Sequence, residues 1–222
     1  MSGKGILDYE ERQWQKGIKR LAGVDEAGRG PLAGPVVAAA VVMPQKLARA
    51  ELNDMFAGLT DSKQISEKKR EHFFSLLNKA DDIEIGVGIC SPAEIDKLNI
   101  LRATHLAMKK AVEALPRLPE HILVDGRPVK GLPVASTSIV KGDSLSLLIA
   151  AASIIAKVTR DHIMCDLDKK YPEYGFAAHK GYGTAAHLAA LKKHGATPVH
   201  RQSFRPVRES SGETFTQMNL LD

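Results

Sequence analysis

Residues 21–37 read Leu21-Ala-Gly-Val-Asp25-Glu26-Ala-Gly28-Arg29-Gly30-Pro-Leu-Ala-Gly34-Pro-Val-Val37. The apolar run that leads to Asp25 predicts a short buried strand. Two adjacent carboxylates end that run, and a Gly-Arg-Gly turn follows them. Because α/β proteins place their chemistry at the ends of strands, this stretch predicts both the first strand of the fold and the position of an active site.

The segments around this stretch alternate between strand and helix patterns. A second apolar run follows over 36–43, and the Gly/Pro turn before it predicts a hairpin with the first strand. Residues 45–65 are polar and are expected to be irregular. The other predicted elements are a short helix within 5–20, a helix over 66–80, a strand over 83–89, a helix over 92–115 that starts in a capping box at Ser91 and Glu94, strands over 121–126 and 134–140, a long helix over 141–163 and a last helix over 184–194. This order predicts an α/β fold, a mixed sheet flanked by helices.

Acidic residues follow three of the predicted strands. Asp25 and Glu26 follow the first, Asp125 ends the fourth, and Asp143 follows the fifth. Each has an alternative interpretation, because Asp25-Glu26 could be a solvated strand end, Asp-Gly is a common turn pair and Asp is a common helix cap. We nevertheless expect the three strands to lie side by side, so that their ends converge in one pocket.

Four carboxylates in one pocket repel each other and need a compensating cation. Hard oxygen ligands suit Mg²⁺ or Mn²⁺, whereas Zn²⁺ would favour His or Cys, which are missing from these positions. Such a pocket in a basic protein predicts two-metal phosphodiester hydrolysis. Neighbouring strand residues point to opposite faces, so Glu26 joins the pocket only if the strand ends or twists at Asp25.

The chain has 222 residues, which suits one domain with at most a small appendage. Its formal net charge is +5, and no Asp or Glu occurs from 174 to 208, where Lys, Arg and His are frequent. This basic run predicts contact with a phosphate backbone; a solvated basic face is the alternative.

Cys90 and Cys165 show no metal-binding spacing, and both are predicted to be buried free thiols. The first twenty residues contain no continuous apolar region, so they predict neither a signal peptide nor a membrane span. We therefore expect a soluble cytoplasmic protein. Gly28, Gly30 and Gly34 miss the dinucleotide-binding spacing by one residue, which argues against a nucleotide-cofactor enzyme.

Seven short motifs occur in order between residues 20 and 208. They are Val-Asp-Glu-Ala-Gly-Arg-Gly-Pro-Leu-Ala-Gly-Pro-Val from Val24, Asp61-Ser-Lys63, Val124-Asp-Gly126, Lys141-Gly-Asp143, the run from Ala151 to Asp161, His179-Lys-Gly-Tyr-Gly-Thr184 and His200-Arg-Gln-Ser-Phe204. In this set the chain resembles the bacterial ribonuclease HII family.

The resemblance implies a ribonuclease H-like core with a small C-terminal helical appendage. It divides the chain into an N-terminal extension (1–20), a catalytic domain (21–183), a basic appendage (184–208) and a flexible tail (209–222). The implied activity is endonucleolytic cleavage of RNA paired to DNA and of DNA 5′ to an embedded ribonucleotide, leaving 5′-phosphate and 3′-hydroxyl ends. The implied metal-binding catalytic residues are Asp25, Glu26, Asp125 and Asp143.

The resemblance also implies residues that bind the substrate. Gly28-Arg29-Gly30 resembles the family's reader of the ribose 2′-hydroxyl, and Tyr182 resembles the aromatic residue that packs on the following deoxyribose. Lys63, Lys157 and Lys180 are candidate phosphate contacts. Asp161 belongs to the family pattern, but it lies about five turns beyond Asp143, so we expect a structural ion pair.

Three alternatives accompany this interpretation. The related ribonuclease HIII typically has Gly-Lys-Gly at the turn and a long N-terminal domain, which twenty residues cannot supply. A hybrid-binding module that does not cleave would have no use for clustered acids beside a polyanion. Residues 217–221 resemble peptides that dock on bacterial sliding clamps, with an ordinary frayed terminus as the other interpretation. A monomer is expected.

Overall fold

The computed structural model describes residues 5–51, 59, 62 and 65–210. In this part of the chain five strands form one sheet in the order β3-β2-β1-β4-β5. Their bounds are β1 Leu21–Ala27, β2 Val36–Val42, β3 Glu84–Cys90, β4 His121–Asp125 and β5 Ser136–Ile139. The β1–β2 and β2–β3 pairs are antiparallel, and the β1–β4 and β4–β5 pairs are parallel. The predicted mixed sheet and its first hairpin are confirmed.

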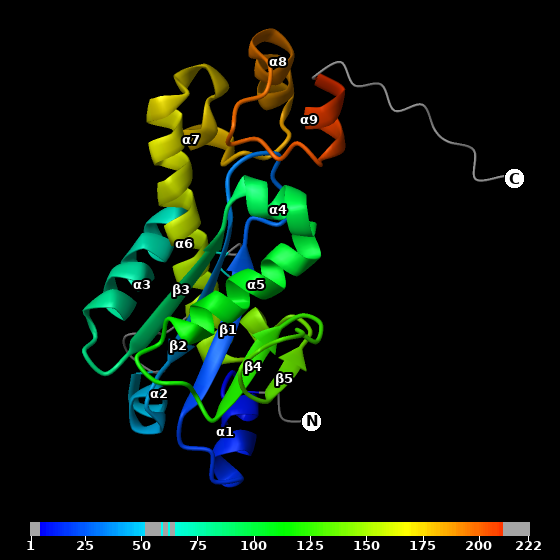
Figure 1. Cartoon of the computed structure of the whole chain (residues 1–222). Coiled ribbons are helices and arrows are strands. Elements are labelled where there is room, and N and C mark those ends of the chain that lie inside the picture. Colours follow the sequence, from blue (N-terminus) through cyan, green and yellow to red (C-terminus); the bar gives the residue numbers. More distant parts are fainter. Residues whose placement is uncertain (1–4, 52–58, 60–61, 63–64, 211–222) are drawn as a thin grey trace, which may run out of the picture.

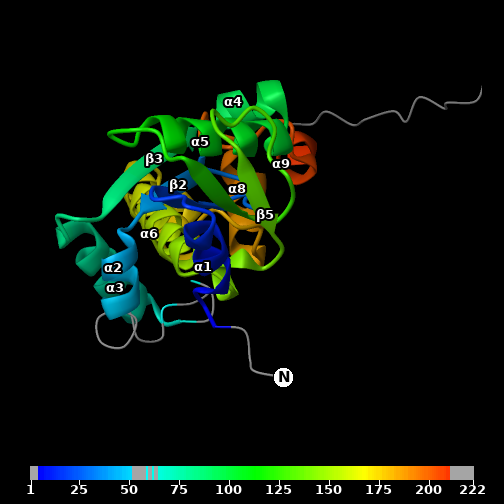
Figure 2. The same ribbon diagram turned by 90° about the horizontal axis from the view of Figure 1, so that it is seen from below.

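Helices cover both faces of the sheet (Figure 1; Figure 2). One face packs against α6 (Leu147–Lys170) and α3 (Glu67–Lys79), and the other packs against α5 (Ile100–Glu113). The approach of α6 to β1 depends on Gly23, because a Cβ atom there would lie 2.1 Å from the carbonyl carbon of Leu148. The strands that precede the predicted carboxylates, β1, β4 and β5, therefore end beside the N-terminal part of α6.

The N-terminal helix α1 (Asp8–Gln15) fixes the start of α6. Glu10 of α1 is fully buried and accepts hydrogen bonds from the Ser146 hydroxyl (2.6 Å) and the Leu148 N–H (3.1 Å). The first N–H groups of a helix lack partners within the helix and attract negative charge, so Glu10 caps α6 from another element. Burial raises the pKa of this carboxyl.

The segment that follows α6, from Pro172 to Ser210, forms a smaller layer beyond one end of the sheet (Figure 1). It contains α7 (Phe176–His179), α8 (Ala185–His194) and α9 (Arg205–Ser210), together with a 3₁₀ turn over Pro172–Tyr174. Their buried side chains share one hydrophobic cluster with Leu32, Ala33 and Met164. The appendage thus packs directly on the loop between β1 and β2. The division of the chain at residues 20, 183 and 208 stays a prediction.

Two helices differ from the sequence prediction. Residues 45–51, expected to be irregular, form α2 (Gln45–Glu51), because Lys, Leu, Ala, Arg and Glu favour a helix and the Ala48 N–H reaches the Pro44 carbonyl. The helix expected over 92–115 is broken into α4 (Pro92–Leu98) and α5, because Asn99 adopts φ 68° and caps α5 with its own side chain. The capping box at Ser91 and Glu94 is confirmed.

Two smaller expectations are corrected as well. The long helix α6 begins at Leu147 rather than at 141, because residues Gly142–Ser144 form a separate 3₁₀ turn. Cys90 is buried as predicted, but Cys165 is partly exposed, because it is not on the buried face of α6. None of the described helices has the length and apolar character needed to cross a membrane.

Candidate active site

Asp25 lies where the pairing of β1 with β4 ends. The last paired residues are Val24 and Val124, so Asp25 and Asp125 follow them at the same level of the sheet. Asp25 is only 5% exposed. Burial raises its pKa well above the ordinary value, and the negative charges of Glu26 and Asp125 raise it further. Three acidic groups therefore act on one another at this strand end, as the sequence predicted.

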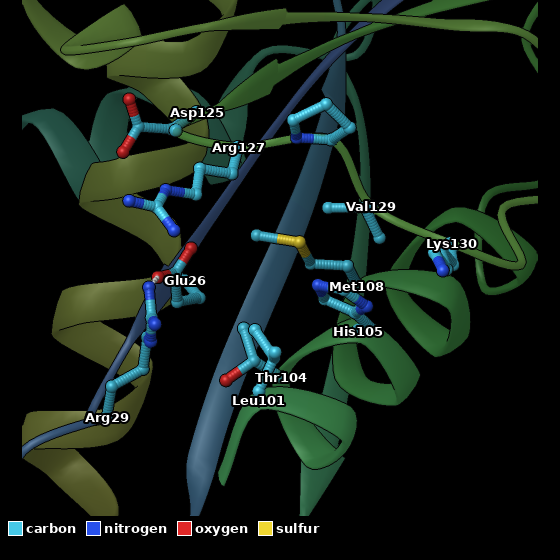
Figure 3. A pocket seen from close by; sticks show the side chains of 12 residues that line it. Glu26, Arg29, Leu101, Thr104, His105, Met108, Asp125, Arg127, Val129 and Lys130 are labelled. Carbon is cyan, nitrogen blue, oxygen red and sulfur yellow. Dashed lines mark hydrogen bonds and ion pairs between the residues drawn. The ribbon is translucent and has the colours of Figure 1, made fainter.

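Glu26 occupies the other face of β1 and still reaches the same end of the sheet. Glu26 pairs with Ala38 of β2, so the strand does not end at Asp25. Its side chain lines a cavity of about 520 Å³ together with Asp125 and Arg29 (Figure 3). The expectation that β1 ends at Asp25 is therefore wrong, since the strand continues to Ala27; only its pairing with β4 ends, at Val24.

Asp143 is held next to Asp125 by the turn that precedes α6. It is 7% exposed and lies in the 3₁₀ turn Gly142–Ser144. The Gly142 N–H donates a hydrogen bond of 2.6 Å to Asp125 Oδ1. This bond connects the ends of β4 and of the β5–α6 connection, so the structure brings all four predicted carboxylates to one region.

The donor set at this end consists of carboxylate oxygens, which suits a hard divalent cation. In the described part of the chain, no three His, Cys, Asp or Glu side chains approach closely enough to hold a metal ion by themselves. Burial first, and then the charges of Glu26 and Asp125, raise the pKa of Asp25, and a bound cation would favour its ionised form. The chemistry of these residues therefore fits a divalent metal, although the carboxylates in the described part of the chain are not close enough together to form a complete coordination site.

Two serines support Asp25 from α6 and from the segment before α3. The Ser153 hydroxyl hydrogen-bonds to Asp25, and Ser62 lies 2.8 Å from Ser153, Oγ to Oγ. Both serines are buried, at 2% and 4% exposure for Ser62 and Ser153. No role was predicted for Ser153, whose signal in the sequence is a single hydroxyl on an otherwise apolar helix face.

The Gly28-Arg29-Gly30 turn lies beside both Glu26 and Tyr182. Arg29 Nη1 is 3.1 Å from Glu26 Oε1. A Cβ atom on Gly30 would lie 3.6 Å from the Tyr182 ring. Tyr182 is 46% exposed. The two predicted substrate-reading elements, 154 positions apart in sequence from Gly28 to Tyr182, therefore form one surface next to the carboxylates.

The candidate lysines have varied surroundings. Lys157 donates to both carboxylate oxygens of Asp161, at 2.6 and 2.7 Å, which confirms the ion pair predicted for Asp161. Lys180 donates to the Ala177 carbonyl at 2.5 Å. Lys63 lies outside the described residues.

Three basic residues at the cavity were missed in the sequence. His105 projects from α5, and Arg127 and Lys130 lie in the loop after β4 (Figure 3). Arg127 follows Asp125 by two positions, so its place after a catalytic strand end was a usable signal. The basic run over 174–208 drew attention elsewhere, and part of it is interior: Arg201, His187 and His200 are at most 1% exposed. For these three residues the predicted phosphate contact is wrong.

Comparison with known proteins gives a consistent result. The family model described as ribonuclease HII matches residues 22–207. This chain belongs to the ribonuclease HII family. It is 52% identical over 206 residues to ribonuclease HII of Desulfitobacterium hafniense, with 93% of this chain and 76% of the relative covered. The resemblance found in the sequence is confirmed, and the protein is a ribonuclease H, an endoribonuclease that acts on RNA paired to DNA.

Solved structures of this enzyme family share the fold. Ribonuclease H2 from Pyrococcus horikoshii superposes with a TM-score of 0.71 at 31% identity, covering 87% of this chain and 97% of that one. Ribonuclease HII from Archaeoglobus fulgidus, solved in a complex with PCNA, gives a TM-score of 0.68 at 25% identity over 84% of this chain and 95% of that one. The ribonuclease H-like fold class is thereby confirmed.

Proposed function

We propose that this enzyme hydrolyses the RNA strand of RNA/DNA hybrids and also cuts 5′ of single ribonucleotides embedded in duplex DNA. The products carry 5′-phosphate and 3′-hydroxyl ends. The observation that carries the proposal is the contact surface between Gly30 and Tyr182, because it lies beside Arg29 and the carboxylates around Asp25. The residues that recognise one ribonucleotide and the carboxylates that bind the metal would therefore act on the same phosphodiester.

Asp25, Glu26, Asp125 and Asp143 would hold the metal, Mg²⁺ or Mn²⁺. Two such ions supply activation of the attacking water and stabilisation of the leaving 3′ oxygen. The protein's part is to keep Asp25 oriented through Ser153 and Asp125 oriented through the Gly142 N–H. These two hydrogen bonds hold the carboxylate oxygens of Asp25 and Asp125 in place before substrate binds.

The Gly28-Arg29-Gly30 turn would recognise the ribose. Glycines allow backbone groups to approach the minor groove, and the 2′-hydroxyl is the group that distinguishes RNA from DNA there. Tyr182 would pack on the sugar of the next nucleotide, since its ring is half exposed and adjacent to Gly30. Together they would choose which phosphodiester meets the carboxylates.

The duplex backbone would be bound by basic side chains near the carboxylates. Arg127 and Lys130 line the cavity on the α5 side, and Lys63, Lys157 and Lys180 are the candidate phosphate contacts predicted from the sequence. Phosphate contacts of this kind give affinity without sequence preference.

A module that binds hybrids without cutting them is disfavoured by charge. Carboxylates beside a polyanion oppose binding, so a pure binder would do better without Asp25, Glu26, Asp125 and Asp143. Asp25 and Asp143 are buried, and Glu26 and Asp125 are partly buried. Their gathering at one end of the sheet is explained by a cation and chemistry that accompany the substrate.

A cleavage assay on end-labelled duplexes tests the proposal. One duplex contains a single ribonucleotide, one is a long hybrid, and one is all DNA as the control. We expect the first to be cut only at the 5′ side of the ribonucleotide, the second at many positions and the third not at all. Cleavage of all-DNA duplex, or none at the single ribonucleotide, would contradict the proposal.

We further propose that residues 217–221, outside the described part of the chain, dock on the sliding clamp. The Archaeoglobus relative was solved in a complex with PCNA, and the sequence Gln217-Met-Asn-Leu-Leu221 resembles clamp-binding peptides. Deletion of residues 217–222 should remove binding to a purified bacterial clamp while cleavage continues. Absent binding by the intact protein would end this proposal. The monomeric state and cytoplasmic location stay predictions.

A further inference from the structure

Two fully buried arginines face the loop between β1 and β2. Arg160 of α6 is 1% exposed, and Arg201, which follows α8, is 0% exposed. The loop they face, residues 28–35, begins with the Gly28-Arg29-Gly30 turn. Both side chains come from elements more than 120 positions away in sequence, so their meeting on one loop is a property of the fold alone.

The guanidinium groups satisfy the carbonyls of this loop. Arg201 donates to Gly28 O (2.5 Å), Arg29 O (3.0 Å), Gly34 O (3.0 Å) and Pro35 O (3.2 Å). Arg160 donates to Pro35 O (3.0 Å) and Ala33 O (3.1 Å). A buried carbonyl without a donor is costly, so the two side chains make this irregular backbone possible.

Both positive charges are compensated by carbonyls. No ion pair among the described residues includes Arg160 or Arg201. A buried guanidinium needs partners for its charge, and here the loop carbonyls supply them. Burial lowers the pKa of Arg201 to about 9, so the group stays protonated at neutral pH. The loop conformation and the charged state of both arginines therefore depend on each other.

Backbone contacts and close packing fix the same loop. Leu32 N–H donates to Gly181 O, Arg201 N–H donates to Leu32 O, and Gly34 N–H donates to Val199 O, each at 2.8 Å. Gly28 has φ 94°, and a Cβ atom there would lie 2.1 Å from Arg160 Nε. Gly28 is therefore required by its left-handed conformation and by the arginine beneath it.

We propose that Arg201, together with Arg160, is a positioning residue that determines specificity for single embedded ribonucleotides. By holding the carbonyls of Gly28 and Arg29 from inside, it fixes the orientation in which Arg29 and Gly30 meet the ribose next to Tyr182. Neither arginine contacts substrate. The inference rests on the proposed role of the Gly28–Gly30 turn as the ribonucleotide reader.

The substitution Arg201→Lys tests this inference, because an ammonium group keeps the charge but cannot reach the four loop carbonyls in a fixed fork. The quantity to measure is kcat/KM on the single-ribonucleotide duplex divided by kcat/KM on the long hybrid. A long hybrid offers a ribose at every position, so it tolerates a displaced reader. We expect the ratio to fall by at least about tenfold, the effect of losing one good hydrogen bond to the reading loop.

Leu191→Ala is the matched control. Leu191 is buried in the hydrophobic cluster that also contains Leu32 and Ala33 of the loop. Truncation of its side chain removes no hydrogen bond to the loop. Fewer folded molecules lower cleavage of both substrates equally, so Leu191→Ala should leave the ratio unchanged at a similar loss of Tm. If Arg201→Lys does not fold, Arg160→Lys takes its place, with the same expectation.

An unchanged ratio in the folded arginine variant, or an equal fall in Leu191→Ala, would overturn the inference. Failure of the proposed function itself would look different. In that case the wild-type enzyme would not cut the single-ribonucleotide duplex, and the ratio would already be zero before any substitution.

Discussion

The strand-end carboxylates and the arginine-supported loop lie next to each other, yet they treat charge in opposite ways. Asp25 is buried beside Glu26 and Asp125, and burial first, then the two like charges, raise its pKa. Arg201 is buried as deeply, but four loop carbonyls accept its hydrogen bonds. In the first region the protein gathers negative charge. In the second, loop carbonyls accept the hydrogen bonds of the positive groups, although burial and the neighbouring charge of Arg160 still lower the pKa of Arg201 to about 9.

The difference separates chemistry from architecture. A group whose charge is met inside the protein holds the fold, whereas a group left among like charges has its complement in a ligand. We therefore expect changes at the carboxylates to affect turnover, and changes in the appendage to affect stability and substrate choice.

Metal removal should give the largest effect. In chelator, cleavage of the single-ribonucleotide duplex should fall by at least about 10³-fold, because a metal ion contributes several kcal/mol of transition-state stabilisation. Added Mg²⁺ or Mn²⁺ should restore it. The duplex should still bind in chelator, as a gel-shift measurement would reveal; undiminished cleavage there would refute the metal assignment.

Low pH should weaken the appendage. The Thr197 N–H donates to His200 Nδ1 (3.0 Å), so this nitrogen carries no proton and the His200 ring is neutral. The Nε2 atoms of His187 and His200 lie 3.1 Å apart, and one of them donates a hydrogen bond to the other. Burial first, and then His187, lowers the pKa of His200 from 6.5 to about 4. Its contribution is complete above about pH 6.5 and is lost as the pH falls towards 4, by at most about 3 kcal/mol.

Urea unfolding between pH 7 and pH 4.5 measures this loss. His200→Gln should flatten the pH dependence, because the titrating group is gone. His72→Gln, at an exposed position of α3, should retain the wild-type slope. Identical slopes for wild type and His200→Gln would show that the buried histidine pair does not respond to pH in this way.

Ser153→Ala should have an intermediate effect. It removes the hydroxyl that bonds to Asp25, and the loss of such a supporting contact lowers activity or metal affinity by about tenfold. Ser62→Ala breaks only the outer hydrogen bond of the pair, so its effect should be smaller. The measurement is kcat across a Mg²⁺ titration, and the reverse ranking would contradict this role for Ser153.

Arg127→Ala should give the smallest effect. If Arg127 neutralises one backbone phosphate, the slope of log affinity against log salt should decrease in magnitude by about 0.9. Lys169→Ala provides the comparison, since its ammonium group pairs with Asp166 at the far end of α6. Equal slopes for Arg127→Ala and wild type would remove Arg127 from the binding surface.

The sequence predicted what short-range patterns determine. Hydrophobic period, the Gly/Pro turn and the capping box at Ser91 were sufficient for the sheet, its hairpin and the convergence of Asp25 with Asp125. The break at Asn99 was missed because helical periodicity continues across it, and a left-handed residue that caps the next helix leaves no periodic trace.

Interior roles of polar residues were beyond the sequence. Arg201 lies in an acid-free basic run. The composition of that run is the same whether the Arg201 side chain contacts a phosphate or loop carbonyls 166 or more positions away. Ser153 differs from its neighbours only by a hydroxyl. Such contacts depend on which elements the fold brings together, and no local pattern encodes that.

The most direct test of the central claim is Asp25→Asn, assayed on the duplex that contains one ribonucleotide. The substitution keeps the shape of the side chain and removes the charge, so we expect cleavage to be abolished while duplex affinity stays at or above the wild-type value. Asp166→Asn, an exposed acid on α6, should behave like wild type. Full cleavage by Asp25→Asn would contradict the assignment of metal-dependent catalysis to this strand end.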